Sequence, residues 1–354
     1  MVKPFLLSHS SVVALCLLLL APTVRAEDAT KLVERLHTAD IGTALDTPGL
    51  KPWHLKMTVQ LFDEKGKPSD EGTIEEWWSS SDLDRREYIT NGYKATEIRH
   101  GATVYRTKGA DLPSFYLEKL REQVVHPIPP TRPDAPPIKP DLRKLNVGKV
   151  ALECISLRPA KGEWNAPLGS SPAYCLDAGT DSLRMTVFLT SLAIARNSIG
   201  RFQGREVSVD VLVSANNTKT ASEHVDSLVA QAIPQSEFAL TEDIAEVVPP
   251  IMLVDGAAMT VAAISQKQPI YPTEAKENHI AGSVIMRAII GTNGNIRDLQ
   301  LISSNDAGLA RSAMSAVRQW TYKPFVREWP ARGSGNYDCR ELYVWAAVTS
   351  NIAI

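Results

Sequence analysis

The feature that most constrains this chain is a two-residue alternation of apolar and polar side chains that returns between residues 53 and 213. It is clearest in two runs, Trp53-Leu55-Met57-Val59-Leu61 and Val207-Val209-Val211-Val213. Because successive side chains of a strand point to opposite faces, this pattern predicts strands with one buried and one solvated face. Turn signals such as Asn91-Gly92 and His100-Gly101 lie between the runs. Short strands joined by tight turns predict an antiparallel meander.

We expect residues 27–240 to form one domain of antiparallel strands with a few helices. Apolar residues at helical spacing predict helices over 27–45 and 117–125. Between the second helix and the next strands lies a proline-rich stretch, residues 127–140. Proline lacks the N–H that a helix interior or a central strand needs, so we expect this stretch to be an extended surface loop.

The overall composition limits the functional classes. The chain has 354 residues, of which 44% are hydrophobic and 22% charged, so it can bury a core in two or three domains. Its net charge is −2 and its pI is about 6.4. A chain with this charge has no general attraction to polyanions, and we expect no nucleic-acid partner.

The first 26 residues have the layout of a secretory signal peptide. Lys3 supplies a positive start, Val12 to Ala21 is an apolar run, and Ala26 is a small residue at the expected cleavage position. The apolar run is shorter than the roughly 20 residues that span a bilayer. We therefore expect export to the periplasm with cleavage after Ala26, and an uncleaved inner-membrane anchor is the alternative.

Three cysteines follow the predicted leader. Cys154 and Cys175 lie in similar strand-like contexts, and export would place them in an oxidising compartment. A disulfide between them is the favoured interpretation, with three buried thiols as the alternative. The role of Cys339 is left open.

The last quarter of the chain has a different pattern. Strands are predicted over 283–290 and 296–303, joined by a turn that contains Asn293-Gly294. Apolar residues at three- and four-residue spacing predict a helix over 307–320. A final strand is predicted over 341–349. The order is strand, strand, helix, strand.

Several motifs in this region occur in the order seen in one known family. They are Gln268-Pro269-Ile270-Tyr271-Pro272, Gly282-Ser283-Val284, Asn293-Gly294, Ser303-Ser304 and the closing run from Val317 to Pro324. Together they resemble the C-terminal domain of the TonB family. The fold class that we expect is therefore α+β: an antiparallel sheet domain over 27–240, a linker over 241–266 and a small ββαβ domain of the TonB type over 267–354.

The TonB resemblance implies a partner-binding function. In that family the domain grips the "TonB box", an extended segment of an outer-membrane transporter, and an unpaired sheet edge can accept such a segment as a further strand. The resemblance implies the following contact residues: Gln268, Pro269, Tyr271 and Pro272, and the edge strand Leu342, Tyr343, Val344, Trp345 and Ala346. For Tyr271, a packed anchor at the domain's entry is an equally favoured interpretation.

A second, weaker resemblance concerns residues 30–240. A leading helix followed by a long meander is similar to the LolA/LolB fold, a curved sheet that holds a cavity for acyl chains in periplasmic lipoprotein carriers. It implies an alternative function, a lipid or lipoprotein carrier with a TonB-like docking module. Trp53, Trp77 and Trp78 could line such a cavity, and ordinary sheet core is the other interpretation.

No catalytic or metal-binding motif is present in the sequence. It has no Gly-x-Ser-x-Gly elbow, no His-Glu-x-x-His pair, no phosphate-binding loop and no dinucleotide fingerprint. Its histidines are scattered, without the spacing of metal ligands. We therefore expect a binding protein without a cofactor and not an enzyme.

Overall fold

The computed structural model describes most of the chain after the predicted leader. The described residues are 26–129, 138–159, 172–189, 191–247, 252–254, 263–323, 326–327, 338–339 and 342–349. Residues 1–25 of the predicted signal peptide and Cys16 lie outside them. Within the described residues, no helix is both long and apolar enough to cross a membrane.

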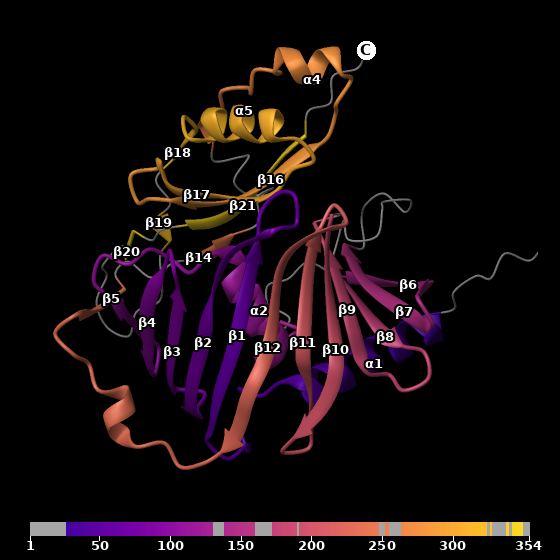
Figure 1. Ribbon diagram of the computed structural model, residues 1–354, viewed down its shortest axis with the longest axis vertical. Coiled ribbons are helices and arrows are strands. Elements are labelled where there is room, and N and C mark those ends of the chain that lie inside the picture. Colours follow the sequence, from indigo (N-terminus) through magenta and orange to yellow (C-terminus); the bar gives the residue numbers. More distant parts are fainter. Residues whose placement is uncertain are drawn as a thin grey trace, which may run out of the picture.

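The described chain is dominated by one antiparallel sheet of 13 strands (Figure 1). In chain order, its strands are β1 (Trp53–Phe62), β2 (Pro68–Ser80), β3 (Leu83–Thr90), β4 (Lys94–His100), β5 (Thr103–Thr107), β6 (Ile138–Val147), β7 (Val150–Pro159), β8 (Ala173–Asp177), β9 (Leu183–Phe188), β10 (Leu192–Phe202), β11 (Arg205–Ala215), β12 (Thr218–Ala230) and β13 (Ile244–Glu246). Their order across the sheet is β13-β5-β4-β3-β2-β1-β12-β11-β10-β9-β8-β7-β6. The predicted antiparallel sheet with few helices is confirmed.

The strand that joins the two halves of this sheet, β12, was not predicted. It pairs with β1 on one side and with β11 on the other. Two of its inward-facing positions are Ala221 and Glu223, both buried, and neither is a large apolar residue. The alternation that marks the other strands is therefore too weak here to be recognised.

The loop predicted for residues 127–140 is wrong at its end, where residues 138–140 belong to a strand, and residues 130–137 lie outside the described residues. Strand β6 begins at Ile138 and includes Pro140. Among the described strands, it is the last one of the sheet and pairs only with β7. Proline is tolerated there because the outer side of an edge strand needs no ladder hydrogen bond.

Two helices pack against one face of the sheet. Helix α1 (Ala26–Thr43) buries Leu32 and Leu36 against β7 and β8. Helix α2 (Phe115–Val125) is capped by the Ser114 side chain, which accepts a hydrogen bond from the Leu117 N–H. Its apolar residues, Phe115 and Val124 among them, belong to one large core cluster together with Trp53 and other residues of β1, β11 and β12.

A buried ion pair fastens α2 to the sheet. Arg121 of α2 donates two hydrogen bonds, each 2.6 Å, to the carboxylate of Glu76 on β2. The Glu76 side chain has no exposed surface, and Arg86 on β3 lies 3.5 Å from it. Arg86 also contacts Asp84 at 2.8 Å. Each buried charge in this group therefore has a partner of opposite sign, as burial requires.

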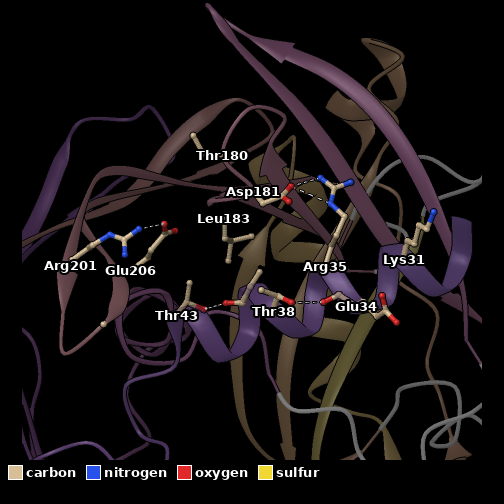
Figure 2. Close-up of a pocket in the computed structure, with 13 residues that line it drawn as sticks. Lys31, Glu34, Arg35, Thr38, Thr43, Thr180, Asp181, Leu183, Arg201 and Glu206 are labelled. Atoms are coloured by element: carbon tan, nitrogen blue, oxygen red, sulfur yellow. Dashed lines mark hydrogen bonds and ion pairs between the residues drawn. The ribbon is translucent and has the colours of Figure 1, made fainter.

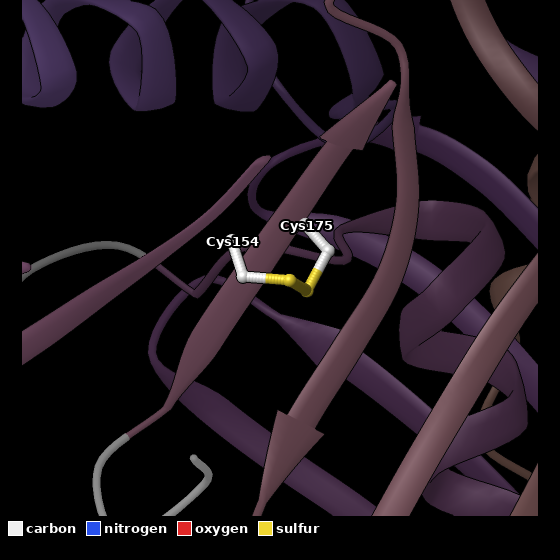
Figure 3. Close-up of a disulfide and its surroundings, with 2 residues drawn as sticks. All are labelled: Cys154 and Cys175. Carbon is white, nitrogen blue, oxygen red and sulfur yellow. A yellow bond between two sulfur atoms is a disulfide. The ribbon is translucent and has the colours of Figure 1, made fainter. Parts of the chain in front are cut away.

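The predicted disulfide between Cys154 and Cys175 is present (Figure 3). The two cysteines are direct cross-strand partners on β7 and β8, and their Cα atoms are 3.8 Å apart. Both side chains are fully buried beside Leu152. The bond therefore fixes the register of these two strands near the β6 edge.

Removing the disulfide should lower the stability of the sheet domain. We expect Cys154→Ala with Cys175→Ala to cost about 2–4 kcal/mol of unfolding free energy, because the unfolded chain regains the freedom of the closed loop. Urea denaturation of oxidised wild type, reduced wild type and the double variant would measure it. Equal midpoints for oxidised and reduced wild type would contradict this expectation.

The C-terminal elements form a smaller, separate sheet at one end of the large one (Figure 1). They are β14 (Met252–Val254), β15 (Ala263–Ser265), α4 (Thr273–Glu277), β16 (Ser283–Ile290), β17 (Ile296–Ser303), α5 (Ala307–Val317), β18 (Thr321–Tyr322), β19 (Val326–Arg327), β20 (Asp338–Cys339) and β21 (Leu342–Thr349). We call them the C-terminal module. Its main sheet has the order β14-β21-β16-β17, and β15 pairs with β18.

Helix α5 covers one face of this sheet. Its N-cap is Asp306, whose side chain accepts from the Leu309 N–H at 2.7 Å. Leu309, Ala313 and Val317 pack on Met286 of β16 in a separate core cluster. The residues predicted as a linker, 241–266, contain the short strands β13, β14 and β15.

Candidate partner-binding site

The Gln268–Pro272 segment is strapped along α5. The Trp320 indole N–H donates to the Lys267 carbonyl at 2.8 Å, and the Ser312 hydroxyl donates to the Ile270 carbonyl. The Lys267 ammonium also donates to the Gln319 side-chain carbonyl at 2.9 Å. The Ile270 carbonyl is thus tied to α5, and the carbonyl of Lys267, just before the segment, is tied to Trp320, just after the helix. These two bonds hold the segment in an extended path.

We call residues 268–272 the strap. Its side chains point in opposite directions. Tyr271 packs on the α5 core, and its hydroxyl donates to the Ile280 carbonyl at 2.5 Å. Ile270 is 77% exposed, and Gln268 is exposed as well. These are the contacts of a packed anchor, one of the two interpretations of Tyr271, and its contact with a partner stays a prediction. Pro269 and Pro272 are half-buried. The motif could not reveal that its variable position, Ile270, faces outward.

The predicted edge strand, β21, pairs along its whole length with β16, from Ser283 opposite Thr349 to Ile290 opposite Leu342. On its other side β14 runs parallel to it and covers Leu342 to Val344. Trp345 and Ala346 have no strand on that side among the described residues. The edge-strand assignment stays a prediction, and three of its five residues already have a neighbour.

The second face of the module's sheet is buried against α2. The Arg287 side chain on β16 is 1% exposed and donates to the Glu118 carboxylate and to the Pro113 carbonyl. The Phe115 N–H donates to the Gln300 side chain of β17 at 3.1 Å. Ile285 and Ile302 enter the large core cluster directly. The sequence did not predict this contact between the two parts of the chain. It closes this face of the module's sheet to a partner.

Glu118 makes this contact sensitive to pH. Burial raises the pKa of Glu118 from 4.5 to about 7, although the charge of Arg287 acts to lower it. A raised pKa means that the folded chain binds the proton more tightly than the unfolded chain does. This contribution to stability is therefore full below pH 4.5 and is lost as the pH rises through about 7. Glu118→Gln should flatten the dependence, as urea midpoints at a series of pH values would show. Parallel profiles for both proteins would contradict it.

The turn between β16 and β17 depends on one glycine. Gly294 has φ +82°, and a Cβ there would lie 2.0 Å from the Tyr322 carbonyl oxygen of β18. The Tyr322 N–H donates to the Gly294 carbonyl at 2.9 Å. The hairpin therefore packs backbone to backbone on the strand that follows α5.

Gly294→Ala should destabilise the module by about 1–3 kcal/mol, because the side chain adds both a collision and a disfavoured φ. Gly101→Ala is the matched control, since Gly101 also has a positive φ but has nothing within 4 Å of its Cβ position. We expect a smaller loss there. Thermal melting of both variants would measure the difference, and equal losses would assign the whole effect to φ.

The three tryptophans proposed for a lipid cavity do not share one face. Trp53 and Trp78 stack with ring centroids 5.8 Å apart, and both are buried in the core that α2 fills. Trp77 points to the opposite face, where it stacks on His54 and packs near Phe238. An acyl chain beside Trp53 would have to displace α2. The carrier function therefore stays a prediction, which a lipid that co-purifies with the chain would support.

Two pockets lie away from these tryptophans. One, of about 550 Å³, lies between α1 and the turns of the sheet (Figure 2). Its charged groups are largely paired with one another: Arg35 contacts Asp181 at 2.5 Å, and Arg201 lies 3.8 Å from Glu206. The other, also about 550 Å³, lies where the β1–β2 hairpin meets β17. Among the described residues, no group of three or more His, Cys, Asp or Glu could hold a metal ion.

Comparison with known proteins finds a family match in the C-terminal part of the chain. Residues 267–335 match the family described as "Gram-negative bacterial TonB protein C-terminal". Protein TonB of Klebsiella pneumoniae is 37% identical over 62 residues, and Protein TonB of Vibrio cholerae is 36% identical over 76 residues. These matches cover 17% and 21% of this chain, and they span 26% and 30% of the relatives.

Solved structures show a distant likeness over part of the chain. A LolA superfamily protein from Nitrosomonas europaea gives a TM-score of 0.37 at 8% identity, over 60% of this chain and 97% of its own. A DUF1329 family protein from Desulfovibrio piger gives 0.38 at 9% identity, over 60% and 96%. The sequence matches, and not these structures, identify one part of the protein. This chain carries a C-terminal domain of the TonB type.

Proposed function

We propose that this chain works in the periplasm as a binding protein, and that its C-terminal module takes up an extended segment of an outer-membrane transporter. The observation that carries the proposal is the match of residues 267–335 to the TonB C-terminal family, together with the strapped segment and edge strand described above. We propose that the module binds this segment, and we assign no residue a catalytic role.

Strand addition supplies the affinity in this proposal. An edge strand offers a row of N–H and C=O groups, and an extended peptide can satisfy them with its own backbone. Side chains then supply specificity. Gln268 and Ile270 are the exposed side chains of the strap, and an apolar contact with Ile270 would remove a large exposed surface from water.

The test uses synthetic peptides that cover the periplasmic N-terminal segments of the host's outer-membrane transporters. Binding of each peptide to the mature chain would be measured by fluorescence anisotropy. We expect at least one peptide to bind, and Ile270→Asp to weaken it by about tenfold or more. Val147→Asp is the control, because Val147 is 50% exposed on the distant strand β6. If no peptide binds and no intact transporter binds the immobilised chain, the proposal is wrong.

A further inference from the structure

The outer edge of β21 is partly occupied by the chain itself. Strand β14 pairs with it in parallel, with Met252 opposite Leu342, Leu253 opposite Tyr343 and Val254 opposite Val344. β14 precedes the family match, which begins at residue 267. Strand β21 follows the match, which ends at residue 335, so the two strands of this edge lie on either side of the matched residues.

We propose that β14 is a replaceable occupant of this edge, and that the partner segment binds by taking its place. The inference rests on the proposed function, because it concerns the same edge. It also states what the incoming segment looks like. Since Met252, Leu253 and Val254 now fill the position, the edge accepts an extended, apolar, β-prone stretch of a partner protein.

The two sides of β21 are held with very different strength. On the inner side, eight antiparallel residue pairs join it to β16. On the outer side, three parallel pairs join it to β14. Parallel pairing is slightly less stable for each residue than antiparallel pairing. β14 can therefore leave while β21 stays in the sheet.

The register also offers a starting point for exchange. β14 and β21 run in the same direction, so the end of β14 at Val254 lies beside Val344. From Trp345 to Thr349, β21 has its β16 partner but no second strand within the part of the chain that the structure describes. An incoming segment can pair there first and then displace β14 one residue at a time. Each step exchanges one backbone pairing for another, so the whole edge is never left open.

The decisive experiment frees the edge without touching β21. Successive amides of a strand point to opposite sides, so Leu253→Pro with Val254→Pro removes at least one N–H that faces β21. The probe is a fluorescein-labelled peptide with the sequence of residues 249–256, Pro-Pro-Ile-Met-Leu-Val-Asp-Gly. The matched control is Ala245→Pro with Glu246→Pro in β13, a three-residue edge strand of the large sheet.

We expect the β14 variant to bind this peptide at least about tenfold more tightly than the wild type and the β13 control do. Equal affinity for all three proteins would overturn the proposal, as would no binding to a β14 variant that melts like the wild type. If the proline variant does not fold, replacing residues 252–254 by Gly-Ser-Gly repeats the test with the same expected results.

A disulfide between β14 and β21 tests the exchange by preventing it. Leu253→Cys with Tyr343→Cys, in a Cys339→Ser background, joins the facing positions of β14 and β21. The oxidised form should bind a transporter-derived peptide more weakly than the reduced form of the same variant does, so the effect of replacing Tyr343 itself cancels. Undiminished binding by the oxidised form would contradict displacement. A further outcome separates the two proposals. If transporter peptides bind none of these proteins, while the 249–256 peptide binds only the β14 proline variant, the proposed function fails and the inference about β14 stands.

Discussion

Replacing Arg121 with methionine is expected to destabilise the chain by about 3–5 kcal/mol, because it leaves the carboxylate of Glu76 buried without its main partner. That carboxylate accepts two hydrogen bonds of 2.6 Å from Arg121 and has no exposed surface. Arg86 lies 3.5 Å away and is shared with Asp84, so it compensates only in part. Urea denaturation would measure the loss.

The double variant separates charge from packing. Glu76→Leu with Arg121→Met removes both charges and keeps most of the volume, so it should be clearly more stable than Arg121→Met alone. Arg86 keeps its contact with Asp84 in that protein. An Arg121→Met variant within about 1 kcal/mol of wild type would show that the pair contributes little, as exposed ion pairs do.

The second large effect is expected at the contact between the two parts of the chain. Arg287→Met removes the bonds to Glu118 and to the Pro113 carbonyl and leaves both acceptors facing a buried methionine. We expect a loss of about 3 kcal/mol, localised to this contact. The C-terminal module should then melt separately from the large sheet instead of with it.

Hydrogen exchange would locate that effect. Amides of α2, β16 and β17 should lose protection in Arg287→Met, while those of β7 and β8 around the disulfide should not change. Arg311→Met is the control, because Arg311 is an exposed arginine of α5 in the same module. Uniform loss of protection throughout the chain would mean that Arg287 stabilises the whole fold and not this contact.

The sequence predicted the strands whose buried positions carry large apolar residues, and it missed those whose positions do not. β1 and β11 were recognised from their alternation, but β12 buries Glu223 and Ala221, and β6 contains Pro140. Local pattern cannot show that such a segment has neighbours on both sides or lies at an edge. Those properties are set by strands far away in the chain.

The candidate site was predictable in the same uneven way. The contact residues over 268–272 and 342–346 are implied by motifs that resemble a known family, and their role stays a prediction. The outward direction of Ile270 depends on bonds from Ser312 and Trp320, which lie more than a helix away in sequence. β14 is only three residues long, too short for any periodicity to identify. The cover on the edge could therefore be found only from the structure.

The position of β12 has a consequence for how the chain reaches its native state. Trp53 at the start of β1 faces Ala230 at the end of β12, so the centre of the large sheet closes a loop that contains nearly all of its other strands. Contacts between residues so distant in sequence slow folding, since the entropy of closing the loop is lost before the pairing is gained. A chain that emerges N-terminus first cannot complete β1 until residues 218–230 have followed. Until then one edge of β1 is unpaired and its apolar side chains are uncovered. This is the stage at which the chain depends most on protection from aggregation.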